Sequence, residues 1–280
     1  MRVISLHSYM RALPSFDSEV VSQAYYTEDV KVLETQGTWV QIQTLQDGYI
    51  GWIESSCIQD DSTRFFPNAS VVALKALVFS EPSISKGYTY LLPFESQIQI
   101  IESLNPRWYK VRLVNGYEGF IQSGDLRHFE STQDKALLQE MLCDLAVKFL
   151  ELPYVWGGRS SIEGYDCSGF IQMLLRQAGF CNIPRDSKDQ YLWNKLIKID
   201  DRDVPKKGDL IFFGKNTEKG PQITHVALSL GNLACIHATV QERPSIHISY
   251  LDTSPWNLTQ PEIFNFRAIK RLKCYTTATR

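Results

Sequence analysis

The sequence predicts an α+β chain in which two small all-β barrels are followed by a mixed α+β domain. Two observations lead to this fold class. A pattern of short strands occurs twice in the first 129 residues, and helical periodicity replaces it after residue 130. The chain has 280 residues, 44% of them hydrophobic, which is enough for two or three domains with separate cores. We expect these domains to span residues 1–61, 62–129 and 130–280.

The repeated pattern consists of three short runs in which apolar and polar residues alternate, as in half-buried strands. In the first copy the runs cover residues 30–35, 39–43 and 48–53, and in the second they cover residues 98–103, 108–112 and 116–121. Asp47-Gly48 and Asn115-Gly116 mark the turn before the last strand of each copy. Two copies are too few for a solenoid, so each is expected to form its own barrel. The barrel cores are expected to hold the tryptophans Trp39, Trp52 and Trp108.

Beyond residue 130 the apolar residues follow the 3.6-residue period of an amphipathic helix, which is expected to end before Pro153. A start near Ser131 is expected, because the hydroxyl of serine can cap a helix. The apolar face consists of Leu137, Leu138, Met141, Leu142, Leu145, Ala146, Phe149 and Leu150. Strand-like runs follow at residues 209–213 and 225–230, so this third domain is predicted to be α+β.

The stretch around Cys167 carries the strongest chemical signal. An apolar run from Phe170 to Ala178 follows it and stops at Gly179, a pattern typical of a buried helix with a glycine at its C-terminal end. Cys167 is therefore expected at the N-terminus of a helix, where the dipole and the N–H groups favour the thiolate. The thiolate is the nucleophilic form of cysteine, so this position favours a catalytic residue over an inert buried one.

A cysteine nucleophile needs a base, and His225 is the best candidate because it opens an apolar strand directly after a loop. His237 lies twelve residues later, beyond a turn at Gly231-Asn232, and is expected on the neighbouring antiparallel strand. Two histidines on paired strands can face the same side, so His237 can orient His225 like the third member of a catalytic triad. The other histidines have no such context: His7, His128 and His247.

Four segments together resemble the NlpC/P60 family of papain-like cysteine peptidases, and they occur in that family's order within residues 135–270. They are Asp166-Cys-Ser-Gly-Phe170, Lys207-Gly-Asp-Leu-Ile-Phe-Phe213, Thr224-His-Val-Ala227 and Ile236-His-Ala238. The two N-terminal copies resemble bacterial SH3 (SH3b) domains through their V-x-V/I, W-V/Y-x-V/I and G-Y-x-G-W/F-I strands. Two SH3b domains ahead of an NlpC/P60 domain are similar to the γ-D-glutamyl-L-diamino acid endopeptidases, also called dipeptidyl-peptidase VI.

The resemblance implies a catalytic role for four residues. Cys167 matches the nucleophile, His225 the base and His237 the residue that orients the base. The Tyr154 hydroxyl is expected to hold the oxyanion together with the Cys167 N–H, a kind of stabilisation worth about 3 kcal/mol per donor. The implied reaction is hydrolysis of the amide between γ-D-glutamate and a diamino acid such as diaminopimelate. The implied substrates are peptidoglycan stem peptides with a free N-terminal L-Ala, and no cofactor or metal is implied.

The resemblance also implies two groups of substrate-binding residues. Arg185 and Ser187 match the family's R-D-S segment, and Ser168 and Ser187 would contact the α-carboxylate of D-glutamate. Asp166 would help to hold the free amine of the first substrate residue. The segment between Pro184 and Gly208 departs most from the family's pattern.

In the dipeptidyl-peptidase branch, a tyrosine and an acidic residue of the first SH3b domain complete the pocket for the amine. Tyr49, in the segment Gly-Tyr-Ile-Gly-Trp, fits the tyrosine. Glu19 is our choice for the acidic residue.

Composition excludes several other classes of protein. A net charge of -2 and a pI of about 6.2 argue against nucleic acid as a partner. No apolar run approaches the ~18 residues of a transmembrane helix, and no signal peptide is evident. We therefore expect a cytoplasmic monomer, or a periplasmic or secreted protein if a leader has been removed. A zinc site is disfavoured because the cysteines lack paired spacing, and most of them are expected to be buried; its candidate ligands would be Cys167, His225, Cys235 and His237.

Two alternatives to the implied reaction stay open. The same chemistry could serve an N-acetylmuramyl-L-alanine amidase, or a hydrolase of intact, cross-linked wall. A non-catalytic wall-binding module is a reading from another class, with the SH3b domains as ligand sites. The set of Cys167, His225 and His237 argues against such a module, because a binding protein has no use for it.

Overall fold

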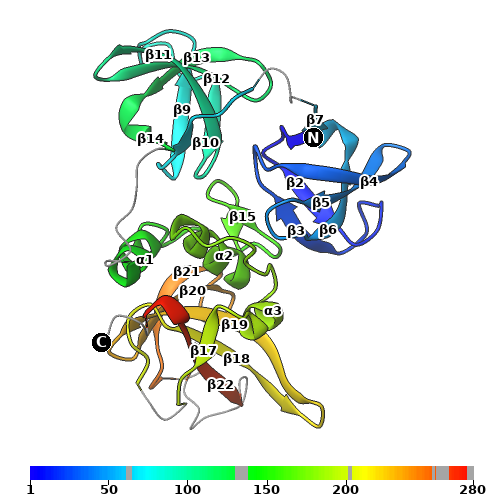
Figure 1. Cartoon of the computed structure of the whole chain (residues 1–280), viewed down its shortest axis with the longest axis vertical. Helices are drawn as coiled ribbons and strands as arrows, with labels where there is room; N and C mark the ends of the chain where they lie inside the picture. The colour runs from blue at the N-terminus through cyan, green and yellow to red at the C-terminus, as the bar shows by residue number, and fades with distance from the viewer. Residues whose placement is uncertain (61–64, 130–137, 201–203, 254–255, 257–264, 276–280) are drawn as a thin grey trace. The chain divides into compact units, whose positions relative to one another are not determined.

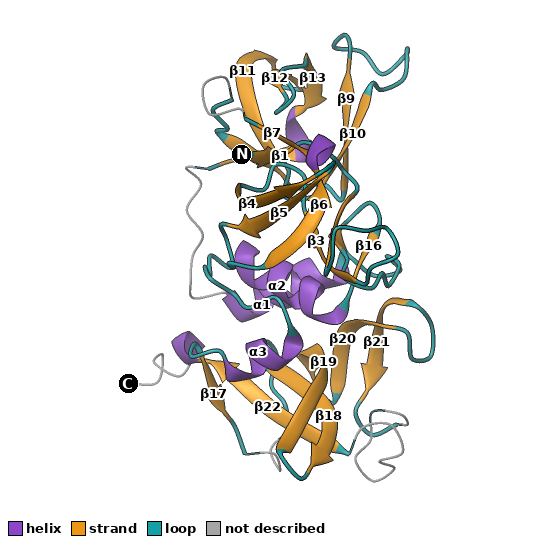
Figure 2. Cartoon of the chain, turned by 90° about the vertical axis from the view of Figure 1, so that its right-hand side faces the viewer, coloured by secondary structure: helices purple, strands orange, loops and turns teal. Residues whose placement is uncertain are grey.

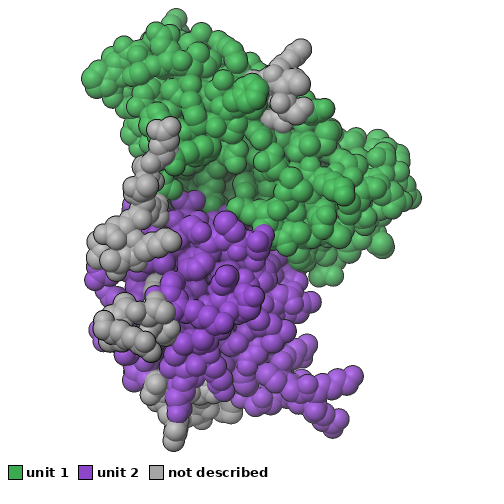
Figure 3. Space-filling model, in the orientation of Figure 1, with its two compact units in different colours: residues 1–133, 156–163 green, residues 134–155, 164–280 purple. Residues whose placement is uncertain are grey.

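The computed structural model describes residues 1–280 except 61–64, 130–137, 201–203, 254–255, 257–264 and 276–280. It contains two compact units (Figures 1 and 3). Unit 1 comprises residues 1–133 and 156–163, and unit 2 comprises residues 134–155 and 164–280. The predicted domain boundaries after residues 61 and 129 adjoin or fall in segments outside the described residues, as does the predicted cap at Ser131. They stay predictions.

The N-terminal sheet of unit 1, drawn in blue in Figure 1, has five antiparallel strands in the order β3-β2-β6-β5-β4. They are β2 (Ser8–Arg11), β3 (Val20–Ala24), β4 (Val30–Gln36), β5 (Trp39–Thr44) and β6 (Ile50–Glu54). Two further short strands, β1 (Arg2–Val3) and β7 (Ile58–Gln59), pair with each other. The side chains of Met10, Ile42 and Ile53 are fully buried in the core of this sheet.

The second sheet of unit 1 has seven antiparallel strands in the order β10-β9-β13-β12-β11-β8-β14. They are β8 (Ala69–Val71), β9 (Lys75–Phe79), β10 (Tyr90–Pro93), β11 (Gln97–Asn105), β12 (Trp108–Arg112), β13 (Glu118–Gln122) and β14 (Leu126–His128). Its core contains Ile98, Val111 and Ile121, and Tyr26, from the turn between β3 and β4, packs into the same cluster.

The two sheets share local features at positions that correspond in the repeat predicted from the sequence. The β4–β5 pairing shifts register between Val32 and Glu34, and the β11–β12 pairing shifts at the corresponding Ile100 and Glu102. Gly51 also corresponds to Gly119, and a Cβ at either position would come within 3 Å of a neighbouring atom. Only glycine fits such a close approach of two strands. The three tryptophans predicted to be core residues are buried: Trp39, Trp52 and Trp108.

Unit 1 also holds a buried ion pair that the sequence did not reveal. The Arg159 guanidinium donates to both carboxylate oxygens of Glu28, over 3.1 and 3.3 Å, and both side chains are almost completely buried. Arg159 also donates its backbone N–H to the Gln23 side chain. These contacts explain why the segment 156–163 folds with unit 1, although its sequence lies in the third predicted domain.

Unit 2 is built on a six-stranded antiparallel sheet in the order β17-β22-β18-β19-β20-β21, drawn in orange in the lower part of Figure 2. The strands are β17 (Leu196–Lys198), β18 (Leu210–Thr217), β19 (Gly220–Gly231), β20 (Ala234–Thr239), β21 (Ser245–Tyr250) and β22 (Phe266–Leu272). The helices are α1 (Leu138–Val147), α2 (Cys167–Gln177) and α3 (Ser187–Leu192). α2 packs against α1, β19 and β20, and α3 packs against β19. Two further short strands are β15 (Arg159–Ser160), which belongs to unit 1, and β16 (Gly164–Tyr165), which belongs to unit 2.

The structure also bears on other sequence-based expectations. The helix predicted to end before Pro153 ends at Val147, and the chain then tightens into a turn in which Leu150 N–H donates to Val147 O. The predicted strands at residues 209–213 and 225–230 are present as parts of β18 and β19. Four of the six cysteines are buried, as expected for small apolar side chains: Cys57, Cys143, Cys167 and Cys235. No helix among the described residues is long and apolar enough to cross a membrane.

Candidate active site

Cys167 is the first residue of α2, as the sequence predicted. Asp166 caps the helix: its backbone is extended and its Oδ1 accepts a hydrogen bond of 2.7 Å from Gly169 N–H. At the other end, Gly179 has a φ of 81° and its N–H donates to Arg176 O. The helix that presents Cys167 is therefore fixed at both ends by the residues that flank it.

Asp166, Ser168 and Arg185 form one buried polar cluster beside Cys167. Arg185 donates to Asp166 Oδ1 over 3.1 Å and to Asp166 Oδ2 over 2.7 Å, which makes the ion pair bidentate. Arg185 also donates to Ser168 Oγ over 2.9 Å. The structure thus brings together three of the predicted substrate-binding residues, and Arg185 already neutralises the carboxylate expected to hold the substrate amine.

The Cys167 side chain is buried, and this burial controls its charge. Burial raises the pKa of the thiol to about 12, and the Asp166 carboxylate adds to the rise. The Val226 backbone N–H, the Arg185 guanidinium and the Ser168 backbone N–H lower the pKa by less. Burial of the thiol therefore opposes the preference for a thiolate that the helix N-terminus was expected to give. The Val226 contact also brings to the sulfur the part of β19 that carries His225.

His225 and His237 lie on the paired antiparallel strands β19 and β20, as predicted. Nε2 of His225 is 2.9 Å from Nδ1 of His237, and both rings are buried. Burial lowers the pKa of both imidazoles, and the nearby histidines lower it further. The neutral forms of both rings therefore prevail at pH 7 in the resting protein.

The hydrogen bonds continue beyond His237 to residues that the sequence did not single out. Nε2 of His237 is 3.1 Å from Ser249 Oγ, and this hydroxyl donates to Glu242 Oε2 over 2.7 Å. Nε2 of His247 is 2.9 Å from the same carboxylate oxygen. His247 pairs directly with His237 across β20 and β21, so its lack of context in the sequence was misleading.

Trp256 covers the histidine pair and was also missed in the sequence. Its ring centroid lies 5.1 Å from that of His225 and 4.4 Å from that of His237, and the side chain is 1% exposed. Phe213 packs against the same indole at 5.2 Å. These apolar rings account for much of the burial that keeps the imidazoles uncharged.

Tyr154 is half-buried, and Cys167 and Asp166 both affect its hydroxyl. Burial raises the pKa of this hydroxyl, and the charges of Cys167 and Asp166 raise it further, so the group is a neutral donor. A parallel β-bridge joins Tyr154 to Tyr165, just before the start of α2. Close by, a Cβ on Gly164 would lie 2.3 Å from Pro153 O, so glycine is required for this approach.

The remaining predicted residues differ in how the structure places them. Ser187 is buried at the first position of α3, and Gln190 in the same helix donates to Ser168 O over 3.0 Å, which ties α3 to α2. Tyr49 and Glu19 lie in unit 1: the Tyr49 hydroxyl is 3.3 Å from Val21 O, and the Glu19 side chain is exposed. Their expected part in an amine pocket stays a prediction.

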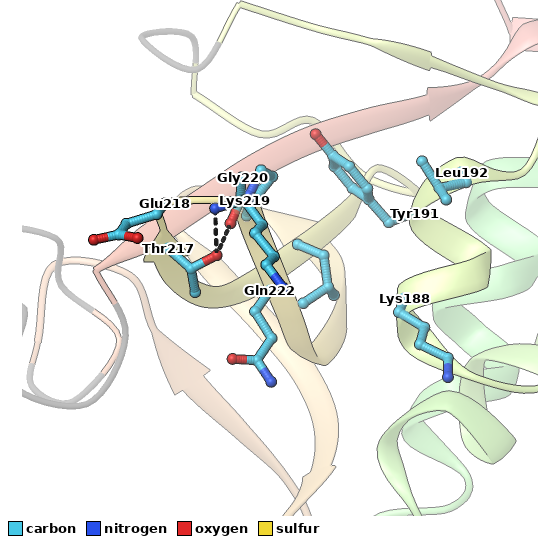
Figure 4. A pocket seen from close by; sticks show the side chains of 10 residues that line it. Lys188, Tyr191, Leu192, Thr217, Glu218, Lys219, Gly220 and Gln222 are labelled. Atoms are coloured by element: carbon cyan, nitrogen blue, oxygen red, sulfur yellow. Dashed lines mark hydrogen bonds between the residues drawn. The ribbon is translucent and has the colours of Figure 1, made fainter.

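A pocket of about 1020 Å³ lies between α3 and the hairpin formed by β18 and β19 (Figure 4). Lys188 and Tyr191 line one side and the hairpin tip lines the other, where Thr217 Oγ donates to Gly220 O over 2.7 Å. None of the residues predicted for the site lines this pocket. The described residues contain no cluster of three or more His, Cys, Asp or Glu side chains arranged to hold a metal ion.

Comparison with known proteins shows which family the chain belongs to. Residues 151–263 match the NlpC/P60 family, and residues 10–58 match the bacterial dipeptidyl-peptidase SH3 domain. The chain is 30% identical to a γ-D-glutamyl-L-lysine dipeptidyl-peptidase of Bacillus cereus, over 84% of this chain and 72% of that protein. The chain belongs to the NlpC/P60 family. This confirms the family resemblance and the prediction of a peptidase, and it confirms an SH3 domain at the N-terminus.

Other members of the family are similar over most of their length. The chain is 30% identical to a protein of the same name from Bacillus subtilis, over 79% of this chain and 73% of that protein. It is 28% identical to dipeptidyl-peptidase 6 of Lysinibacillus sphaericus, over 85% and 87% of the two chains. The crystal structure of an NlpC/P60 family protein from Bacillus cereus superposes with a TM-score of 0.72 and 26% identity, covering 90% of this chain and 82% of that one.

Proposed function

We propose that this peptidoglycan peptidase hydrolyses the amide bond between γ-D-glutamate and a diamino acid, with Cys167 as its nucleophile. The observation that carries the proposal is the combination of Cys167 at the start of α2 with the His225–His237 pair on strands β19 and β20. A nucleophile, a base and a residue that orients the base are what covalent acyl transfer needs.

In the first half of the proposed reaction, the Sγ–H proton of Cys167 passes to Nδ1 of His225 as sulfur attacks the carbonyl carbon. Proton transfer coupled to attack suits a resting thiol and a neutral imidazole, which is the protonation state that burial favours here. The oxyanion accepts hydrogen bonds from the Tyr154 hydroxyl and the Cys167 backbone N–H, since the first N–H groups of a helix have no partner within it. His237 accepts from Nε2–H of the imidazolium.

In the second half, the C–N bond breaks and the His225 imidazolium gives its proton to the departing amine. This leaves the γ-glutamyl group as a thioester on Cys167. His225, again neutral, takes a proton from water as the water oxygen attacks the thioester carbon. The C–S bond then breaks, and the imidazolium returns this proton to the sulfur, which regenerates the thiol. The product carboxylic acid loses its own proton to solvent, so atoms and charges balance without a cofactor.

The finer choice of substrate rests on the relatives and on the domain order. Three relatives carry dipeptidyl-peptidase names, and two of these names specify the γ-D-glutamyl-L-lysine bond. We extend this to a γ-D-glutamyl–diamino acid bond in peptides with a free N-terminal L-Ala. The second sheet of unit 1, which repeats the strands of the first, is proposed to be a second SH3b domain.

The test is digestion of defined peptides with the product masses read out. L-Ala-γ-D-Glu-diaminopimelate should give L-Ala-D-Glu and free diaminopimelate. A peptide with an acylated amine, or one still attached to muramic acid, should be cut at least roughly tenfold more slowly in kcat/KM, because charge-assisted hydrogen bonds to an ammonium contribute ~1.5–3 kcal/mol each. Tyr49→Phe should reduce the ratio of kcat/KM between the free and the blocked peptide, because it should weaken cleavage of the free-amine peptide more.

The alternatives give different products. Release of muramic acid from the L-Ala amine would indicate an amidase, and equal cleavage of free and blocked peptides would favour intact wall as the substrate. Wall binding that requires residues 1–128, together with no hydrolysis of any peptide, would indicate a binding module.

A further inference from the structure

The strongest feature outside the catalytic triad is the set of polar contacts behind His237. Ser249 and His247 lie on β21, and Glu242 lies in the turn between β20 and β21. Ser249 Oγ and His247 Nε2 both contact Glu242 Oε2, at 2.7 and 2.9 Å. These contacts connect the buried His225–His237 pair to a single carboxylate, whose side chain is 38% exposed.

The carboxylate sets the direction of every hydrogen bond in this chain. A carboxylate only accepts, so Ser249 Oγ–H donates to Glu242. The Ser249 oxygen then accepts from His237, which requires the hydrogen of that ring to be on Nε2. In a neutral ring this leaves Nδ1 of His237 as an acceptor.

The same reasoning extends to His225. Because Nδ1 of His237 accepts, the hydrogen of His225 must be on Nε2, the atom 2.9 Å away. In neutral His225, Nδ1 then carries no hydrogen and is the basic nitrogen. Glu242 therefore determines the tautomer that a base for Cys167 requires, although Ser249 and His237 lie between it and His225 in the series of hydrogen bonds.

The backbone at Glu242 is a second, independent observation. Glu242 has a φ of 65°, in the left-handed region that glycine adopts without strain and glutamate does not. The structure thus keeps glutamate at a position where glycine would be less strained, which makes Glu242→Gly a test that separates the side chain from the backbone.

We propose that Glu242 is a positioning residue that, through Ser249, fixes the tautomers of His237 and His225 so that Nδ1 of His225 is the base. The inference rests on the proposed role of His225 and deepens it. The amide of Glu242→Gln can donate to Ser249, which allows every hydrogen bond of the chain to reverse. The reversed chain puts the hydrogen of His225 on Nδ1, where it blocks proton transfer from Cys167.

The first test compares steady-state kinetics of four variants with the wild type on L-Ala-γ-D-Glu-diaminopimelate. Glu242→Gln and Ser249→Ala should each lower kcat by about 10- to 100-fold with little change in KM, as for other residues that orient a functional histidine. The double variant should lose no more than either single variant, because both break one chain. Glu151→Gln is the matched control. The Glu151 carboxylate pairs with Arg243, the residue after Glu242, and this variant should retain wild-type kcat.

Glu242→Gly separates this role from a structural one. Glycine adopts a positive φ without strain, so the melting temperature of the Glu242→Gly variant should equal or exceed that of the wild type. Its kcat should nevertheless fall as in Glu242→Gln. Wild-type kcat in Glu242→Gly, or a loss of kcat in Glu242→Gln that only follows a loss of folded protein, would overturn the proposal.

The second test reads the tautomers directly and does not depend on turnover. In full-length Cys167→Ala labelled with ¹⁵N-histidine, the ring nitrogens of His225 and His237 should both report hydrogen on Nε2. Adding Glu242→Gln should shift one or both toward hydrogen on Nδ1. Hydrogen on Nδ1 of His225 before that change, or no shift after it, would contradict the proposal even if the enzyme proved to cut a different bond.

Discussion

His225 and His237 are joined by a hydrogen bond of 2.9 Å between Nε2 of the first ring and Nδ1 of the second. The two rings have different neighbours. The ring on β19 lies beside Val226, whose N–H faces the Cys167 sulfur, and the ring on β20 faces Ser249. This arrangement fits the proposed roles, in which His225 exchanges protons with the thiol and His237 holds His225 in position.

Replacing each histidine should have unequal effects. His225→Ala removes the base and should lower kcat by roughly 10²–10⁴-fold, whereas His237→Ala only loosens the geometry and should cost less. Steady-state kinetics on one peptide substrate give both values, and His128→Ala, on the surface of unit 1, serves as the control. A larger loss for His237→Ala than for His225→Ala would show that the two roles had been exchanged.

The pH dependence of thiol alkylation should reveal the resting state of Cys167. Burial raises the pKa of this thiol, so the reactive thiolate should be scarce at pH 7. The alkylation rate should therefore still be rising above about pH 8.5, where an ordinary cysteine is already half ionised. The measurement uses iodoacetamide and a Cys181→Ser/Cys274→Ser background, which removes the two exposed thiols. A rate that is already at its plateau below pH 7 would mean that the resting pair is a thiolate and an imidazolium instead.

Removing the indole over the histidines should change the acidic side of the pH–rate profile. Trp256→Ala lets water reach His225, so the pKa that burial now holds low should rise toward the ordinary histidine value. A protonated His225 cannot accept the Cys167 proton, so kcat/KM should begin to fall at a higher pH as the solution is acidified. Trp108→Ala, a buried tryptophan of unit 1, should leave the profile in place, and an equal shift in both variants would refute this role for Trp256.

The buried Arg159–Glu28 pair should make a large contribution to the stability of unit 1. Glu28→Gln removes one of two buried carboxylates that pair with the Arg159 guanidinium, since Asp47 Oδ2 also lies 3.7 Å from it. The free energy of unfolding should therefore fall by about 1.5–3 kcal/mol in urea titrations, as for lost hydrogen bonds to a charged group. Glu81→Gln, which breaks an exposed pair with Lys86, should change stability by less than about 1 kcal/mol. Equal effects at both pairs would mean that burial does not matter here.

Much of the fold could be predicted from the sequence because it depends on patterns of residues that are close together in the chain. Strand alternation and turn residues identify the repeat, and Gly179 marks the end of α2. The pairing of the strands that carry His225 and His237 follows from the short turn between them. Such features depend on neighbours in the chain, so a single sequence is enough to reveal them.

The rest depends on contacts between residues far apart in the sequence. The partners of Arg159 and Arg185 follow from tertiary packing, and so does the position of Trp256 over the histidines. His247 could not be linked to His237 because the β20–β21 register is not evident from either strand alone. The burial of Cys167, which raises the pKa of its thiol, could not be predicted for the same reason, since burial depth has no local signature.

The most direct test of the central claim is the activity of Cys167→Ala on L-Ala-γ-D-Glu-diaminopimelate. The substitution removes one sulfur atom at the start of a helix that Asp166 caps, so the melting temperature should change by no more than about 4–8 °C. Hydrolysis should be abolished, because no thioester can form. Turnover at the wild-type rate in this folded variant would contradict the assignment of Cys167 as the nucleophile.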